Sequence, residues 1–202
     1  MGVTDRKARE FQRREDDILK ASFELFVEKG KDAVTIDMIA EGAEVGKGTV
    51  YKHFSSKNEI FARLALNSGN QTHALMLEID SSMPVLVQMK TIMRLFWDTA
   101  VNDIKTFAFV RECEAYLLDD DMPPEIVEEI NALYMKKKKA IMALLQRAID
   151  EQIIMDEPLE QIAALVTGLF QGVIDQVLIG EIEPSEEFYD NFQSFLLRGL
   201  MR

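Results

Sequence analysis

The chain predicts an all-α protein, with a small N-terminal head of three helices and a larger helical body. Apolar residues recur with helical spacing along most of its 202 residues, and no stretch alternates apolar and polar residues as a half-buried strand would. The breaks between these segments are short and rich in Pro, Gly, Asp and Ser, as helix boundaries are. We expect residues 1–56 to form the head and residues 57–202 the body.

The first helix of the head is expected over residues 15–29. Leu19, Phe23 and Phe26 lie on one wide apolar face, and Gly30 suits a left-handed C-terminal cap. The charged segment before it, residues 5–14, has two interpretations that both stay open. It is either a frayed, soluble terminus or a basic arm that reaches backbone phosphate.

Two short helices follow, over residues 36–43 and 47–53. Thr35 suits the N-cap of the first, and Val50 is the clearly apolar residue within the second. A helix so short and so polar does not serve the core. Supported by a larger helix behind it, it has the dimensions to enter the major groove of DNA, as in a helix-turn-helix.

The fourth helix begins with a capping box, in which Ser56 is followed by Glu59 three residues later, and its pattern continues to about residue 79. Further helices are expected over residues 84–102, 104–119, 124–153, 159–179 and 186–201.

With these residues in hand, the chain resembles the TetR family of transcriptional regulators over about residues 14–64. The resemblance is carried by Gly30 ending the first helix, by GKGTVYKHF as recognition helix and by SSKNE opening the fourth. It implies a repressor that binds operator DNA as a homodimer and is released by a small, hydrophobic effector. The DNA-contacting residues that it implies, with support from their chemistry, are Thr35, Lys47, Gly48, Thr49, Tyr51, Lys52, His53 and Lys57.

One position departs from the family pattern. The family has glycine at the turn between the two short helices, where this chain has Glu44. A non-glycine residue in the left-handed conformation costs roughly 1 kcal/mol. Either Glu44 tolerates that cost, or Gly42 loosens the corner.

Residues 159–179 are too apolar all round for the surface helix of a monomer. A central core helix is one interpretation. The other, which the family resemblance also implies, is a four-helix dimer interface made with the last helix. The candidate interface residues are Leu165, Leu169, Gly172, Val173, Phe188, Phe192, Phe195 and Leu196.

The body also carries methionines, aromatic residues and a cysteine suited to an apolar effector pocket, although core packing explains each of them individually. The candidates are Met76, Met89, Met93, Phe96, Trp97, Phe109, Cys113, Tyr116 and Met142. Four successive lysines, residues 136–139, sweep most of a helix circumference. They are either a solvated face or include one that meets a carboxylate of the body or of an anionic effector.

The composition and the charge distribution limit the kinds of partner that we expect. The net charge is −12, yet residues 1–63 carry 12 basic and 12 acidic residues, so that segment is neutral and residues 64–202 hold the whole excess. A single cysteine fits a reducing cytoplasm, and we expect no secretory signal and no membrane partner. No Glu-x-x-His, CxxC, glycine-rich phosphate loop or elbow serine occurs, so we expect no enzyme, metal site or cofactor. Regulation by a protein partner, or without a ligand, stays an alternative.

Overall fold

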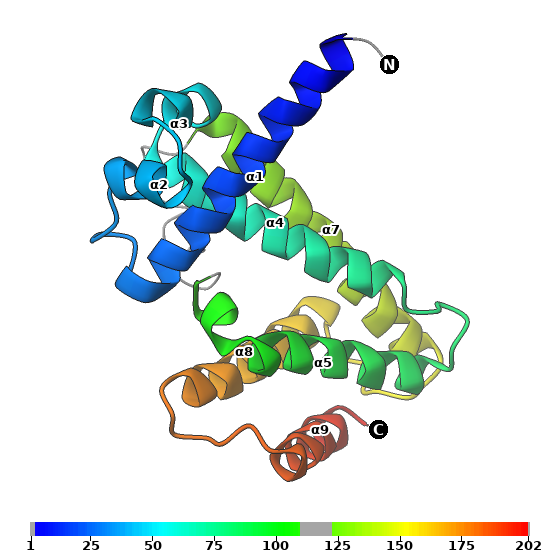
Figure 1. The fold of residues 1–202 in the computed structure, drawn as a ribbon. Coiled ribbons are helices and arrows are strands. Elements are labelled where there is room, and N and C mark those ends of the chain that lie inside the picture. Colours follow the sequence, from blue (N-terminus) through cyan, green and yellow to red (C-terminus); the bar gives the residue numbers. More distant parts are fainter. Residues whose placement is uncertain (1–2, 110–122, 202) are drawn as a thin grey trace. The chain divides into compact units, whose positions relative to one another are not determined.

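The computed structural model describes residues 3–109 and 123–201 and is all-α there, as predicted (Figure 1). Its helices are, in order, α1 (Val3–Lys29), α2 (Ile36–Gly42), α3 (Lys47–His53), α4 (Lys57–Leu77), α5 (Val85–Asn102), α7 (Pro124–Asp150), α8 (Leu159–Leu178) and α9 (Glu186–Leu200). Residues 104–109 are also helical. Within the described ranges β-pairing is limited to one isolated bridge, between Ile154 and Met201.

The chain divides into two compact units. The first comprises Met1–Ser68 and Phe109–Ile130, and the second comprises Gly69–Ala108 and Asn131–Arg202. Residues of α4 and of α7 therefore belong to both units. The boundary expected at residue 56 separates a DNA-binding part from an effector-binding part, and it stays a prediction. The first compact unit extends beyond this boundary, along α4 to Ser68.

Two helices differ from their expected limits. α1 begins at Val3 rather than at residue 15, so the charged segment continues the helix. Side-chain pairs one turn apart explain this extension, since Arg13 reaches Asp17 at 3.1 Å and Arg14 reaches Glu10 at 3.1 Å. α7 ends at Asp150 rather than at residue 153, because Gln152 turns left-handed with φ 59°.

One apolar core holds the first unit together. Phe109 lies among three other phenylalanines, with ring centroids 5.5 Å from Phe23, 6.0 Å from Phe26 and 4.8 Å from Phe61. Burying one such side chain contributes about 1.5–3 kcal/mol. The buried members of this core come from α1 to α4, from the loop before α2, from the C-cap of α3 and from the helical residues 104–109: Ile18, Leu19, Phe26, Val34, Ile39, Ala40, Val50, Phe54, Ile60, Phe61 and Phe109.

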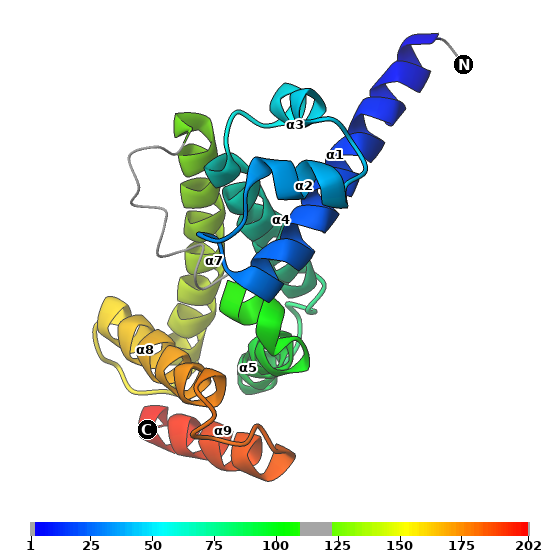
Figure 2. The ribbon, with the colours of Figure 1, turned by 60° about the vertical axis from the view of Figure 1, so that its left-hand side comes forward.

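In the second unit, α5 packs against α8 and α9 (Figures 1 and 2). Trp97 of α5 is 1% exposed, and its ring centroid lies 6.0 Å from that of Phe188 and 5.4 Å from that of Tyr189. α4 and α7 also approach closely there, because a Cβ added at Gly69 would lie 2.8 Å from Cδ2 of Leu133. A residue with a Cβ at this position would require the Leu133 side chain to shift.

Candidate nucleic-acid interface

The corner between α2 and α3 is built on a left-handed Glu44, with φ 53°. The Glu44 N–H donates to the Glu41 carbonyl at 3.1 Å, and the Val45 N–H donates to the Ala40 carbonyl at 2.9 Å, which satisfies the end of α2. Gly42 stays helical, and a Cβ there would lie 3.4 Å from that of Ala21. Of the two expected solutions, the chain uses strain at Glu44, while Gly42 lets α2 lie close to α1.

α3 presents a polar face to solvent. Val50 is fully buried and anchors the helix in the core of the first unit. Lys47, Gly48 and Lys52 are exposed, and Thr49 is half-buried. Tyr51 is 51% exposed, one turn after Lys47 on the same face. These residues therefore stand together on a surface that a groove of DNA can reach.

Lys47 is held in place by a neighbour from α2. Its ammonium donates to Oδ2 of Asp37 at 2.8 Å, and this hydrogen bond raises the pKa of Lys47. Both side chains are more than half exposed, so the pair is weak. A phosphate or a base edge can replace Asp37 as the partner of Lys47 at little cost.

Thr35 and Lys57 have structural partners of their own. The Thr35 hydroxyl accepts from the Met38 N–H at 3.3 Å and caps α2, as expected. The part-buried Lys57 ammonium donates to the carbonyls of Lys31 at 2.6 Å and of Val34 at 2.8 Å. Lys57 therefore closes the loop that precedes α2.

α4 begins with the expected cap. The Glu59 N–H donates to the Ser56 hydroxyl at 3.1 Å. The Glu59 carboxylate in turn accepts from the N–H and the hydroxyl of Ser55, each at 2.7 Å. The reciprocal bond thus reaches one residue further back than in the usual capping box.

His53 lies at the end of α3 with its side chain only 3% exposed. Its ring centroid is 3.9 Å from that of Phe11, and Nδ1 faces Oε2 of Glu15 at 3.6 Å, too far for a hydrogen bond. This placement leaves the imidazole little access to a phosphate. The sequence pattern assigned no role to Phe11, although a lone aromatic residue one turn before Glu15 in a charged segment was the available signal.

A groove of about 610 Å³ lies between the N-terminal half of α1 and α3. In both ribbon views α1 extends past α3 at this end (Figures 1 and 2). The groove is lined by the basic residues Arg6, Lys7, Arg14 and Lys52 and by Glu10, Phe11, Thr49 and His53. A second hollow, of about 380 Å³, adjoins the corner at Glu44 and shares Arg14 and Thr49 with the first.

The candidate pocket residues lie in three places. Met89, Met93 and Phe96 belong to one core cluster of the second unit, Trp97 to another, and Phe109 to the aromatic core of the first unit. Met76 is 7% exposed, and Met142 of α7 is half-buried. Cys113 and Tyr116 lie outside the described residues. Phe109 thus belongs to a different compact unit from the other described candidates.

The candidate interface residues divide into an exposed and a buried group. Leu165, Leu169 and Phe195 are 65%, 46% and 68% exposed, and Gly172 is exposed beside them. Val173 and Phe188 are half-buried. Phe192 and Leu196, at 7% and 3% exposed, pack in a core cluster of the second unit.

α8 is unusually exposed to solvent for a helix of such apolar composition. By length and composition it is the one helix in the described parts of the chain that could cross a membrane, and 17% of its apolar window is buried. That test alone is weak, since helices of soluble proteins also pass it. The exposed apolar face requires a cover of some kind.

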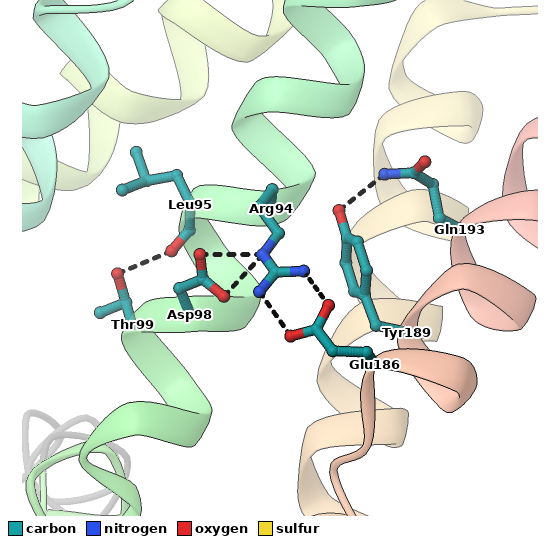
Figure 3. Close-up of polar contacts among 7 residues, drawn as sticks. All are labelled: Arg94, Leu95, Asp98, Thr99, Glu186, Tyr189 and Gln193. Carbon is teal, nitrogen blue, oxygen red and sulfur yellow. Dashed lines mark hydrogen bonds and ion pairs between the residues drawn. The ribbon is translucent and has the colours of Figure 1, made fainter.

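A charged cluster joins α5 to α9. Figure 3 shows the guanidinium of Arg94 between Asp98, at 2.7 Å from Nε, and Glu186, at 2.8 Å from Nη2. Arg94 also lies 4.9 Å from the ring centroid of Tyr189. Its hydrogen bond lowers the pKa of Glu186, while burial raises the pKa of Tyr189. The cluster fixes the start of α9 against α5.

Among the four lysines of α7, one differs from the rest. Lys137 is half-buried, whereas Lys136, Lys138 and Lys139 are exposed. Its Nζ would lie 3.5 Å from a Cβ at Gly69, so this lysine points toward α4 within the second unit.

The comparisons with known proteins agree with the geometry of α1–α4. The family described as bacterial regulatory proteins, tetR family, matches residues 18–64. YdeS of Bacillus subtilis, an uncharacterized HTH-type transcriptional regulator, is 58% identical over 40 residues, which are 20% of each chain. The HTH-type transcriptional repressor KstR2 of Mycobacterium tuberculosis is 37% identical over 60 residues, 30% of each. These matches span less than a third of either relative.

The fold is shared over a longer range. The crystal structure of PfmR from Thermus thermophilus, a TetR family transcriptional regulator, superposes with a TM-score of 0.74 over 92% of this chain and 99% of that one. The sequence identity is 20%, so the likeness is one of fold.

Proposed function

We propose that the chain, which the tetR family model matches over residues 18–64, is a transcriptional repressor of the TetR family rather than an enzyme. In this proposal it binds operator DNA as a homodimer in the cytoplasm, and a small apolar molecule releases it. Residues 1–56 bind DNA, and residues 57–202 bind the effector and dimerise.

The solvent-facing polar side of α3 is the single observation that carries the DNA-binding role. A helix anchored through Val50 and His53 leaves Lys47, Tyr51 and Lys52 available to the major groove. We assign Gly48 and Thr49 to close backbone approach and to contact with a phosphate or a thymine methyl. Thr35 supports the interface from the start of α2, where the amide groups favour an anion.

Two substitutions test this assignment. Lys47→Ala and Tyr51→Ala should each abolish specific binding to a duplex that the wild-type protein selects from a random-sequence pool, as measured by fluorescence anisotropy. Both side chains are exposed, so the melting temperature should stay within about 1–2 °C of wild type, in line with surface changes of about 0.5 kcal/mol. Lys20→Ala, an exposed change on α1, is the matched control. Full binding by the Tyr51→Ala variant would remove α3 from the interface.

The homodimer is supported by the exposed apolar side of α8 and α9. A second copy covers such a surface symmetrically, and a DNA-binding dimer matches two half-sites about one helical turn apart. Gly168 and Gly172 have no heavy atom within 4 Å of an added Cβ, which leaves room for a facing helix. We assign Leu165, Leu169 and Phe195 to the centre of the interface.

Light scattering after size-exclusion chromatography tests the dimer. Leu165→Glu should convert it to a monomer, because a buried unpaired carboxylate is costly at an interface. Val87→Glu is the matched control, since Val87 of α5 is also exposed, at 46%, and lies outside the proposed interface. A dimer that survives Leu165→Glu, or one that both variants lose, would contradict the assignment.

The effector proposal rests on the methionine and aromatic side chains of the second unit. Met89, Met93 and Phe96 cluster there, and Met142 of α7 is accessible beside Ile141. Thioethers and rings adapt to an apolar ligand. Native mass spectrometry of the purified protein should reveal a bound small molecule, and adding that molecule should weaken DNA binding. DNA binding that is unaffected by every co-purifying molecule would favour the ligand-independent alternative.

A further inference from the structure

The groove between the N-terminal half of α1 and α3 shares Thr49 and Lys52 with the helix-turn-helix contacts assigned above, and its other wall, on α1, has no role in them. Four cationic residues, Arg6, Lys7, Arg14 and Lys52, face one carboxylate, that of Glu10. The chain as a whole carries a net charge of −12, so this concentration of positive charge runs against its composition. Such a concavity is complementary to a polyanion.

The single carboxylate of the groove is already engaged. Glu10 accepts hydrogen bonds from Arg13 and Arg14, each at 3.1 Å, and these lower its pKa. Arg6, Lys7 and Lys52, in contrast, form no hydrogen bond or ion pair with other described residues. Three cations of the groove therefore remain available for an external anion.

The cations stand on a rigid support. α1 is one continuous helix, and its later turns are fixed in the core through Ile18 and Phe26. Lys7 and Arg14 are seven residues apart, which is about 10 Å along the helix axis. Successive phosphates of one DNA strand rise about 3.4 Å each, so this distance matches the rise of about three phosphates.

A tilted stack of two rings sets the distance between the two walls of the groove. Phe11 of α1 lies on His53, the last residue of α3, with 3.9 Å between ring centroids, and His53 also faces Glu15. The imidazole side chain is 3% exposed, whereas Phe11 is 49% exposed and rests over it. His53 therefore contacts α1 rather than the solvent from which DNA would approach.

We propose that this groove binds the phosphate backbone of duplex DNA, so that the N-terminal half of α1 is a second DNA-contacting element beside the helix-turn-helix. Phe11 and His53 are positioning residues, which hold the cations of α1 beside Lys52 of α3. The inference rests on the proposed DNA-binding function and assigns it additional, sequence-independent contacts. Such contacts add affinity and salt dependence and leave the choice of sequence to α3.

The test measures the salt dependence of binding. The probe is a duplex that the wild-type protein selects from a random-sequence pool, and fluorescence anisotropy gives the affinity between 50 and 200 mM salt. In the proposed homodimer, Arg6→Gln combined with Lys7→Gln removes four cations, so the slope of log K against log salt should fall by about 3.6, or about 0.9 for each phosphate that the variant no longer neutralises. Over this fourfold range of salt, the affinity of the variant should therefore fall about 150-fold less than that of wild type.

A matched control keeps the charge change and moves it away from the groove. Lys20→Gln combined with Lys29→Gln removes two exposed cations from the same helix. Its slope should equal that of wild type. Equal slopes for wild type and the groove variant, or an equal loss in the control, would overturn the proposal.

The positioning role has its own readout. Phe11→Ala removes no charge, yet it should lower the salt slope towards that of the groove variant, whereas Phe11→Tyr keeps the stack and the wild-type slope. The preference for the selected duplex over a scrambled one should be the same in all these variants. A wild-type slope in Phe11→Ala would refute the positioning role. If the wild-type protein selects no duplex at all, the DNA-binding function itself fails, a result distinct from the others.

Discussion

Replacing Glu44 by glycine should stabilise this protein, because the corner between α2 and α3 holds a residue with a Cβ in the left-handed conformation. That conformation costs a non-glycine residue about 1–2 kcal/mol. Glycine also increases the entropy of the unfolded chain, which lowers the stability of the variant by about 0.4–1 kcal/mol. The free energy of unfolding should therefore rise by about 0.5–1 kcal/mol, and the melting temperature by about 1–4 °C.

Urea denaturation followed by circular dichroism at 222 nm measures this change. Glu44→Ala separates backbone strain from charge, since it removes the carboxylate and keeps the Cβ, and it should leave the stability nearly unchanged. Gly30→Ala is the reverse experiment. Gly30 has φ 77° and no heavy atom within 4 Å of an added Cβ, so alanine should destabilise by about 1 kcal/mol through conformation alone. If Glu44→Ala stabilised as much as Glu44→Gly, the strain argument would be refuted.

Three further predictions concern packing, a loop clamp and a charged cluster. Gly69→Ala should destabilise the protein by up to about 2 kcal/mol in urea denaturation. Overpacking against Leu133 costs about 1–3 kcal/mol, and the higher helix propensity of alanine offsets about 1 kcal/mol of it. In a Leu133→Ala background the same change should become neutral or stabilising. Lys57→Met should cost about 1–3 kcal/mol, because two carbonyls lose their donor, and an unchanged stability would show that Lys57 is not the loop clamp. Arg94→Met should destabilise at pH 7, and the difference from wild type should shrink as the pH falls through the folded-state pKa of Glu186, which lies below its usual 4.5. An equal difference at pH 7 and pH 3 would contradict this pairing.

Much of the head follows from local sequence signals. Thr35 caps α2 and Ser56 caps α4 as predicted, since a cap depends on one side chain and the amide groups three residues later. The recognition helix has its predicted limits for a similar reason, because its start and end depend on neighbouring residues. These local rules explain why the family resemblance is recognisable over about 50 residues.

These local rules did not predict where α1 begins. The charged segment at its start has no apolar periodicity, so the sequence left its structure open. Its ion pairs one turn apart favour a helix, and the stack of Phe11 on His53 ties it to α3. That stack joins residues 42 positions apart, which no local pattern predicts.

By itself, then, the sequence determined the helical class, the caps and the polar face of α3, all of which depend on the order of residues within a few turns. The tertiary structure decided which apolar residues face inward. Phe192 and Leu196 of α9 are buried, whereas Phe195 of the same helix and Leu165 of α8 remain exposed, although the sequence made all four candidates for one interface. It likewise gave His53 a ring contact with Phe11 and Lys57 two backbone carbonyls as partners, while their DNA contacts stay predictions. Burial and partnership depend on residues far apart in the chain, and only folding brings these together.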